Sequence, residues 1–187
     1  MLQRKLKYYS YSQQFKKKQK FAKTYLCSFV NASPVQLFKA CQMKKVTASI
    51  EINNTASKVI DAFLQPAMLQ DWWNAERCLI QPQSGGLYTI AWDVSNTGFR
   101  YVSSGIITVY QPGIMLVIEK MVYLNPEHPI LGPMTLSILA EQHENTTSLH
   151  LTQDGYREYP DWDWYYDAVK NAWPQVLQTL KAYLEKE

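Results

Sequence analysis

The last stretch of the chain, from Trp162 to Leu184, constrains the fold more than any other segment. Its apolar and aromatic residues recur three and four positions apart over about six helical turns, at positions 162, 165, 166, 169, 173, 176, 177, 180 and 184. This spacing predicts one long helix with a single apolar stripe, and Pro174 predicts a kink or a brief break after Trp173. Because such a stripe has to be buried, the rest of the chain must supply a layer that covers it.

Strand patterns in the middle of the chain can form that layer. Apolar residues alternate with polar ones, and turn residues such as Asn96-Thr97-Gly98 and Pro112-Gly113 separate the runs. The predicted strands cover residues 46–53, 77–81, 87–94, 99–110, 114–124, 134–140 and 148–153. Prolines at 126, 129 and 133 indicate a loop over residues 125–133, before the sixth of these strands.

Two short helices are expected between the first two strands. Val59, Ala62 and Phe63 share one side of the first helix, and Pro66 ends it and opens a second that reaches Asp71-Trp72-Trp73. The predicted fold is therefore α+β. It has a curved antiparallel sheet of about six to seven strands, two short helices and one long C-terminal helix packed across the sheet.

Charge divides the chain into a basic extension, residues 1–43, and an acidic domain, residues 44–187. Residues 1–45 hold 11 Lys and Arg and no Asp or Glu, whereas the remainder holds 8 Lys and Arg against 16 Asp and Glu. The extension is expected to be disordered or untranslated, with Met43 as the true start. The alternatives are a targeting segment or a basic tail that contacts anionic lipid or nucleic acid. The acidic domain lacks the cluster of Lys and Arg residues that is typical of a nucleic-acid-binding surface.

Composition and cysteine usage narrow the class of protein. The chain is 47% hydrophobic and 19% charged with 7 Gly, which excludes collagen-like and wholly disordered proteins. No run approaches the ~18 apolar residues of a membrane span. Cys27, Cys41 and Cys78 are odd in number and widely spaced, which argues against a disulfide scaffold or a thiolate zinc site. A cytoplasmic protein is expected.

The order of elements, together with particular motifs, resembles the SRPBCC or START-like superfamily, also called the helix-grip or birch-pollen-allergen fold. More narrowly, it resembles the branch of homologues of the activator of heat shock protein 90 ATPase. The resemblance covers about 44–187. Its motifs are the first strand running into Ala56–Ala62, Gly85-Gly86-Leu87-Tyr88, Thr135-Leu136-Ser137-Ile138, Asp154-Gly155-Tyr156, and Trp173 with residues 180–185.

This resemblance implies a lipophilic cavity between the sheet and the long helix, but it implies no single activity. Members include ligand carriers, cyclases and chaperone partners. The true chaperone activators carry a separate amino-terminal domain, which residues 1–43 cannot supply, and this places co-chaperone activity in doubt.

Aromatic residues on the predicted strands and helix are the candidates for lining the cavity. Rings offer large apolar faces with a few hydrogen-bonding tips, although the same set could form an ordinary filled core. Of the neighbours Trp72 and Trp73, we expect Trp72 to point inward and Trp73 to lie near the mouth. The predicted cavity residues are Trp72, Tyr88, Ile90, Trp92, Tyr101, Tyr165, Val169 and Trp173.

Polar candidates are few. Glu119 interrupts an apolar strand, so it would be a general acid or base if it pointed into the cavity, and an ordinary solvent-facing residue otherwise. The histidines, at 128, 143 and 150, are not spaced as metal ligands, and no metal or other cofactor is expected. Trp164 lies away from the helix stripe and is expected to rest on a loop, flank the mouth or mark a partner surface.

Three functions remain open at this stage. The first is the binding of a small apolar or aromatic molecule in the cavity. The second is a cyclase or hydrolase type of enzyme that uses acid–base chemistry in the same cavity. The third is a module that binds a protein partner, as the chaperone activators do.

Overall fold

A computed structural model of the protein describes residues 44–186. The basic extension predicted for 1–43 lies outside the described residues. Within the described range, no helix has the length and apolar character needed to cross a bilayer.

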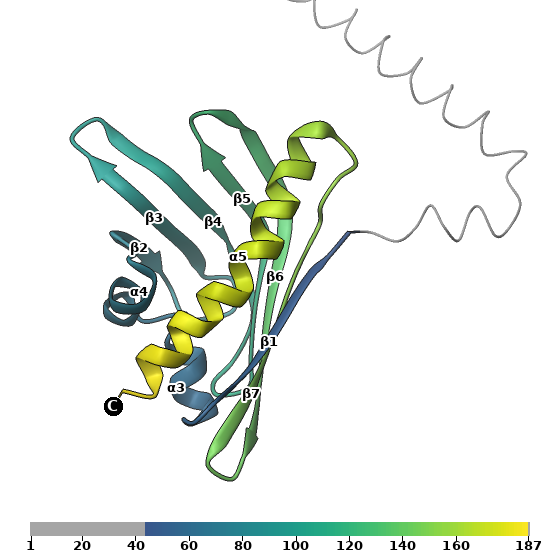
Figure 1. Ribbon diagram of the computed structural model, residues 1–187. Coiled ribbons are helices and arrows are strands. Elements are labelled where there is room, and N and C mark those ends of the chain that lie inside the picture. Colours follow the sequence, from purple (N-terminus) through teal and green to yellow (C-terminus); the bar gives the residue numbers. More distant parts are fainter. Residues whose placement is uncertain (1–43, 187) are drawn as a thin grey trace, which may run out of the picture. The chain divides into compact units, whose positions relative to one another are not determined.

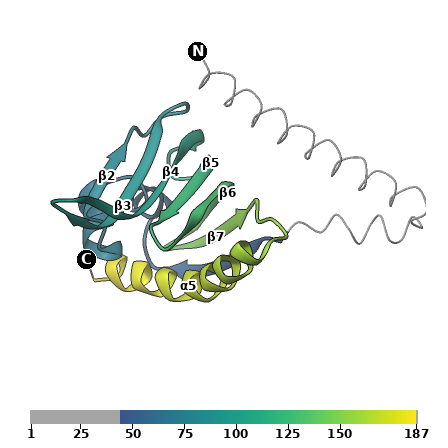
Figure 2. The same cartoon turned by 90° about the horizontal axis from the view of Figure 1, so that it is seen from above.

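One antiparallel sheet of seven strands forms the body of the domain, in the order β1-β7-β6-β5-β4-β3-β2. The sheet curves, and its concave face is the side on which helix α5 lies (Figure 2). The predicted α+β helix-grip architecture is therefore confirmed. The strands are β1 (Val46–Ile52), β2 (Arg77–Ile80), β3 (Leu87–Ser95), β4 (Gly98–Gln111), β5 (Met115–Asn125), β6 (His128–His143) and β7 (Thr146–Asp154).

The two predicted short helices, α3 (Ala56–Asp61) and α4 (Pro66–Trp73), connect β1 to β2. The Thr55 side chain accepts a hydrogen bond from the Lys58 backbone N–H at 3.3 Å, which caps the start of α3. Pro66 opens α4, where its missing N–H has no cost, and Asn74 ends it in the left-handed region at φ 53°. The last turn of α4 carries the neighbours Trp72 and Trp73.

Helix α5 (Pro160–Leu184) is continuous, so a break after Trp173 is not present. Pro174 lacks one backbone donor, a loss that ordinarily kinks or breaks a helix. Here the apolar stripe is buried on both sides of the proline, with Trp173 6% exposed and Leu177 1% exposed. Packing of the stripe therefore outweighs the local preference of proline.

The prediction of a loop over residues 125–133 is wrong. β5 and β6 are joined by a tight turn at Pro126-Glu127, and Pro129 and Pro133 lie within β6. The pairing of β5 with β6 shifts register repeatedly beyond Ile118. Proline is tolerated within a sheet at such irregularities, where the missing N–H is not needed by the ladder.

The C-terminal turns of α5 are packed solid against the rest of the domain. Leu177, Leu180 and Leu184 are at most 1% exposed, and each contributes ~1.5–3 kcal/mol through burial. The Lys181 ammonium donates to the Glu51 carbonyl oxygen at 2.6 Å, which ties this end of the helix to β1. The N-terminal half of α5 instead faces a hollow.

Candidate functional site

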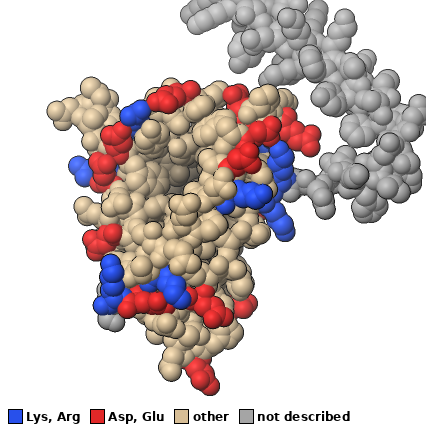
Figure 3. All heavy atoms as spheres, viewed as in Figure 1, with Lys and Arg blue, Asp and Glu red and all other residues tan. Residues whose placement is uncertain are grey.

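A cavity of about 390 Å³ lies between the concave face of the sheet and the N-terminal half of α5. Its mouth is visible in Figure 3 as a hollow surrounded mostly by uncharged residues. All of the predicted cavity residues except Trp72 line it. The sheet contributes Tyr88, Ile90, Trp92 and Tyr101, and the helix contributes Tyr165, Val169 and Trp173.

Trp72 points inward as expected, but its assignment to the cavity residues requires a correction, because its neighbour Trp73 takes that place in the wall. Trp72 is 2% exposed, and its indole Nε1 donates to the Ala62 carbonyl oxygen at 2.8 Å. The ring packs edge-on against Phe63 at 5.3 Å and stacks on Trp73 at 5.1 Å between ring centres. Trp72 is therefore a supporting layer behind the wall.

Trp73, expected near the mouth, lines the cavity itself. Its ring centre lies 5.3 Å from that of Trp92 and 5.6 Å from that of Trp173. The indole of Trp92 donates to the Trp73 carbonyl oxygen at 3.1 Å. Three tryptophans from α4, β3 and α5 thus meet at one end of the cavity, in the ring spacings that favour aromatic contact.

Several lining residues were missed by the sequence reasoning. Ala168 and Ala172 lie on the side of α5 that faces the cavity, and their small side chains leave space that larger residues would fill. Met121 and Tyr123 come from β5, where the shifts in strand register break the regular alternation that would identify the inward-facing residues. The other lining residues missed are Ser103, Leu136, Gln153 and Val176, whereas Trp73 and Trp164 were considered only as residues near the mouth.

Gln153 is the polar centre of the cavity wall. It lies on β7 and is 3% exposed, and its side-chain amide oxygen accepts a hydrogen bond from the Trp173 indole at 3.0 Å. Its amide nitrogen donates to the Tyr165 hydroxyl at 3.4 Å and to the Met134 sulfur at 3.5 Å. A buried amide is costly unless it is hydrogen-bonded, and here both ends of the amide have partners.

The hydroxyls of Tyr165 and Tyr88 in the wall are neutral at physiological pH. Burial raises the pKa of Tyr165 to about 12, opposed in part by the hydrogen bond from Gln153. Burial also raises the pKa of Tyr88. The Tyr88 hydroxyl has no hydrogen-bond partner among residues 44–186. Each hydroxyl is therefore a neutral donor and acceptor rather than a base.

Glu119 does not reach the cavity. It lies on β5 as an exposed residue and is not among the lining residues. Among the described residues that line the cavity there is no Asp, Glu, His, Lys or Arg side chain. The described part of the chain also contains no group of His, Cys, Asp and Glu able to hold a metal ion.

Trp164 lies on the lining of the cavity and against β6. Its ring stacks on His128 at 4.0 Å and meets Tyr165 edge-on at 5.6 Å between ring centres. Trp164 therefore packs on the start of β6 next to the turn and also borders the cavity. This placement agrees with the first two of the three expectations rather than with a free partner surface.

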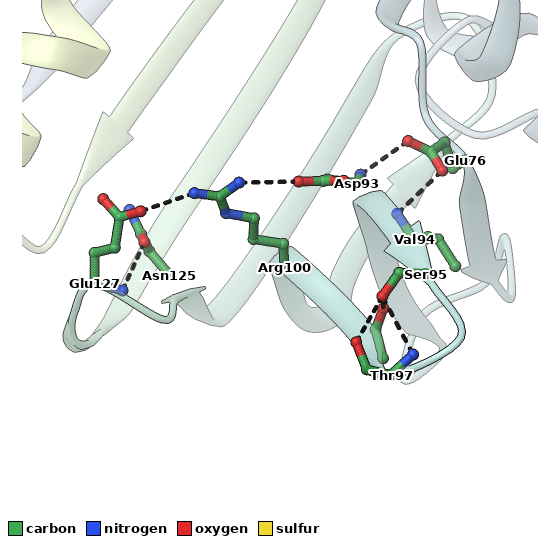
Figure 4. Close-up of polar contacts among 9 residues, drawn as sticks. Glu76, Asp93, Val94, Ser95, Thr97, Arg100, Asn125 and Glu127 are labelled. Atoms are coloured by element: carbon green, nitrogen blue, oxygen red, sulfur yellow. Dashed lines mark hydrogen bonds and ion pairs between the residues drawn. The ribbon is translucent and has the colours of Figure 1, made fainter.

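A polar network braces the strands beside Trp92 and Tyr101. The Glu76 carboxylate accepts from the backbone N–H groups of Asp93 at 2.9 Å and Val94 at 3.0 Å (Figure 4). Arg100 donates to Asp93 at 3.4 Å and to Glu127 at 2.8 Å. Asp93 adopts φ 54°, in the left-handed region, next to the lining residue Trp92.

The network spans segments that are distant in sequence. Glu76 follows α4, Arg100 lies on β4 and Glu127 lies in the β5–β6 turn. The Arg100 pairs are largely exposed, so each contributes little free energy individually. Their role is geometric, because they link the segment between α4 and β2 to the ends of the β3–β4 and β5–β6 hairpins.

The sequence matches a protein family over most of the described domain. Residues 53–185 match the family described as Activator of Hsp90 ATPase homolog 1-like protein. The match spans every element from α3 to α5. A search of curated proteins found no significant match to this sequence.

Solved bacterial structures share the fold. Protein MLL2253 from Mesorhizobium loti is 21% identical, with 76% of this chain and 98% of that chain covered and a TM-score of 0.62. The Aha1 dimer from Colwellia psychrerythraea is 20% identical, with 76% and 97% covered and a TM-score of 0.56. Protein CV1439 from Chromobacterium violaceum is 21% identical, with 75% and 96% covered and a TM-score of 0.58. At these identities the likeness concerns the fold alone.

Proposed function

Because the chain belongs to the family of Activator of Hsp90 ATPase homolog 1-like proteins, we propose that it uses the helix-grip cavity to bind a small hydrophobic or aromatic molecule. The observation that carries this proposal is the cavity of about 390 Å³ between the sheet and α5. Ligand sites of drug-sized molecules are clefts of about 300–1,000 Å³ lined mainly by apolar and aromatic residues. The cavity meets both criteria.

The shape of the wall supports a flat or ring-containing ligand. Trp73, Trp92 and Trp173 present ring faces and edges at one end, and Tyr123 stacks on Tyr165 at 5.0 Å elsewhere in the lining. Aromatic side chains bind flat apolar surfaces with a defined orientation, because offset and edge-on contacts are preferred.

The charge of the wall supports a neutral ligand. No formally charged side chain lines the cavity within residues 44–186. A charged group moved from water into such a site loses its hydration without a compensating partner. The free energy of transfer therefore favours uncharged molecules.

The two other functions considered from the sequence have less support. Acid–base catalysis was attached to Glu119, which is exposed outside the cavity, and the lining residues include no carboxylate or imidazole. A partner surface was attached to Trp164, whose ring is instead packed on His128.

A neutral fluorescent probe tests the proposal. N-phenyl-1-naphthylamine, titrated into the full chain, is expected to bind with a saturable rise in fluorescence at one site per chain. Native mass spectrometry of protein purified gently from its own cells, without detergent, is expected to show added mass that is lost on denaturation. A linear, unsaturable fluorescence response together with bare protein in the spectrum would contradict the proposal.

A further inference from the structure

The hydrogen bonds along the cavity wall have a fixed direction. An indole N–H can only donate, so the atom of Gln153 that faces Trp173 must be the amide oxygen. The amide nitrogen then faces Tyr165 and Met134, where it donates to the hydroxyl oxygen and to the sulfur. Trp173 thereby determines the orientation of the whole amide group, which would otherwise be ambiguous.

This direction leaves the Tyr165 hydroxyl with an uncommitted hydrogen. The hydroxyl oxygen accepts from Gln153 at 3.4 Å. Its own hydrogen cannot be accepted by the amide nitrogen, which is a donor, and no hydrogen bond donated by Tyr165 is present within residues 44–186. Tyr165, Gln153 and Trp173 all line the cavity, so the free donor belongs to the cavity wall.

The geometry points to a ligand that carries a neutral carbonyl oxygen on its apolar body, which accepts a hydrogen bond from the Tyr165 hydroxyl. This inference rests on the proposed binding function and names its chemical class. An acceptor is required because the remaining hydrogen of Tyr165 is a donor. A neutral acceptor is favoured over a carboxylate because no cationic side chain lines the cavity in the described domain.

The chain of bonds also strengthens the donor. A hydroxyl that accepts a hydrogen bond is polarised and donates more strongly, as in other hydrogen-bonded chains of low local dielectric. Tyr165 is 8% exposed and is held between Tyr123, at 5.0 Å, and Trp164, at 5.6 Å, between ring centres. Its hydroxyl therefore has a restricted position, which lowers the entropy cost of binding a carbonyl.

A matched pair of neutral probes tests the inference. 2-Acetylnaphthalene carries a carbonyl oxygen where 2-isopropenylnaphthalene, of nearly the same shape, carries a methylene group. Dissociation constants of both are measured by calorimetry on the full chain, on Tyr165→Phe and on Tyr156→Phe. The last variant is a matched control, since the Tyr156 hydroxyl is also buried next to Tyr165 but does not line the cavity.

The alkene is more hydrophobic than the ketone, so the two absolute affinities differ for reasons other than the hydrogen bond. The informative quantity is therefore the change in the ratio of the ketone affinity to the alkene affinity between variants. A neutral hydrogen bond changes an affinity by about three- to tenfold. We expect this ratio to fall by about three- to tenfold in Tyr165→Phe, through weaker ketone binding, and to stay unchanged in Tyr156→Phe. Unchanged alkene affinity in Tyr165→Phe shows that the cavity has kept its shape.

Three outcomes would overturn the inference. If the ratio is the same in the parent chain and in Tyr165→Phe, the carbonyl contact is absent while the proposed apolar binding stands. If 2-naphthoate binds the parent chain more tightly than the ketone, the preferred acceptor is a carboxylate rather than a neutral oxygen. If none of these probes binds, the proposed function fails and the inference fails with it.

Discussion

The indole Nε1 of Trp173 donates to the side-chain oxygen of Gln153 across 3.0 Å, and so joins helix α5 to strand β7. Both residues are nearly inaccessible, with Trp173 6% exposed and Gln153 3% exposed. Where the cavity separates α5 from the sheet, the two layers are not packed directly against each other. This hydrogen bond fixes the distance between the two layers at the point where the solid core ends and the cavity begins.

The first prediction concerns this contact. Gln153→Leu removes the partner of the Trp173 indole and of the Tyr165 hydroxyl, and a buried group left unpaired costs about 1–3 kcal/mol. The free energy of unfolding, measured by urea denaturation, is expected to fall by about that amount. Gln111→Leu, at an exposed position at the end of β4, is the matched control and is expected to change it by less than about 0.5 kcal/mol. Equal losses in the two variants would contradict the role given to Gln153.

The second prediction concerns the space on the helix side of the cavity. Ala172 is exposed but lines the cavity. Ala172→Phe therefore places a ring at the open side of the cavity and is expected to weaken binding of N-phenyl-1-naphthylamine at least about tenfold, because the ring takes space that the probe needs. Ala182→Phe makes the same change at an exposed position of the same helix that does not line the cavity. Its probe affinity is expected to equal that of the parent chain. Loss of binding in both variants, or in neither, would place the probe elsewhere.

The fold could be predicted from the sequence because its signals are periodic and long. The stripe from Trp162 to Leu184 and the alternation along β3 depend on local spacing, and the structure confirms both elements. A bulge was expected at Gly105, and the pairing of β4 with β5 shifts there between Ser104 and Ile106. The prolines of β6 misled the prediction, since only the register shifts of its partner strand make them compatible with pairing.

The cavity could be predicted only in part. Whether a strand residue lines the wall depends on which face of the sheet its side chain is on, and residue type alone does not determine that face. Tyr88, Ile90 and Trp92 follow a regular alternation and were identified. Tyr123 follows an irregular segment of β5, so counting by twos along the strand did not find it. Gln153 did carry a signal, since it continues the inward phase of Leu149 and Leu151, where a polar residue is unexpected.

The third prediction concerns the network beside the cavity. Glu76→Ala removes the acceptor of the Asp93 and Val94 backbone N–H groups, which are held at 2.9 and 3.0 Å. Amide hydrogen exchange at these two residues, followed by NMR, is expected to accelerate by about three- to tenfold, in line with the loss of about one hydrogen bond. Glu119→Ala, at an exposed position of β5, is the control and is expected to leave both exchange rates unchanged. Unaltered rates in Glu76→Ala would show that the left-handed conformation at Asp93 needs no support from this carboxylate.

The fourth prediction concerns stability at high pH. Burial raises the pKa of Tyr165 from 10.0 to about 12 in the folded chain. As the pH rises, the unfolded chain loses this proton before the folded chain does. The contribution of the neutral phenol to the free energy of unfolding is therefore fully present below pH 10, and it is lost as the pH rises from 10 towards 12. The free energy of unfolding is therefore expected to be insensitive to this group up to about pH 9 and to fall above pH 10.

Variants separate this effect from that of other tyrosines. Burial also raises the pKa of Tyr88 and Tyr156, so the fall above pH 10 is expected to persist in part when only Tyr165 is replaced. Tyr165→Phe is expected to reduce the slope of unfolding free energy against pH between 10 and 12, measured by urea titration at each pH. Tyr159→Phe, where the ring is 65% exposed, is expected to retain the slope of the parent chain. A slope that Tyr165→Phe leaves unaltered would mean that the Tyr165 phenol titrates alike in the folded and unfolded chains, and that its hydroxyl is open to solvent rather than held in the wall of the cavity.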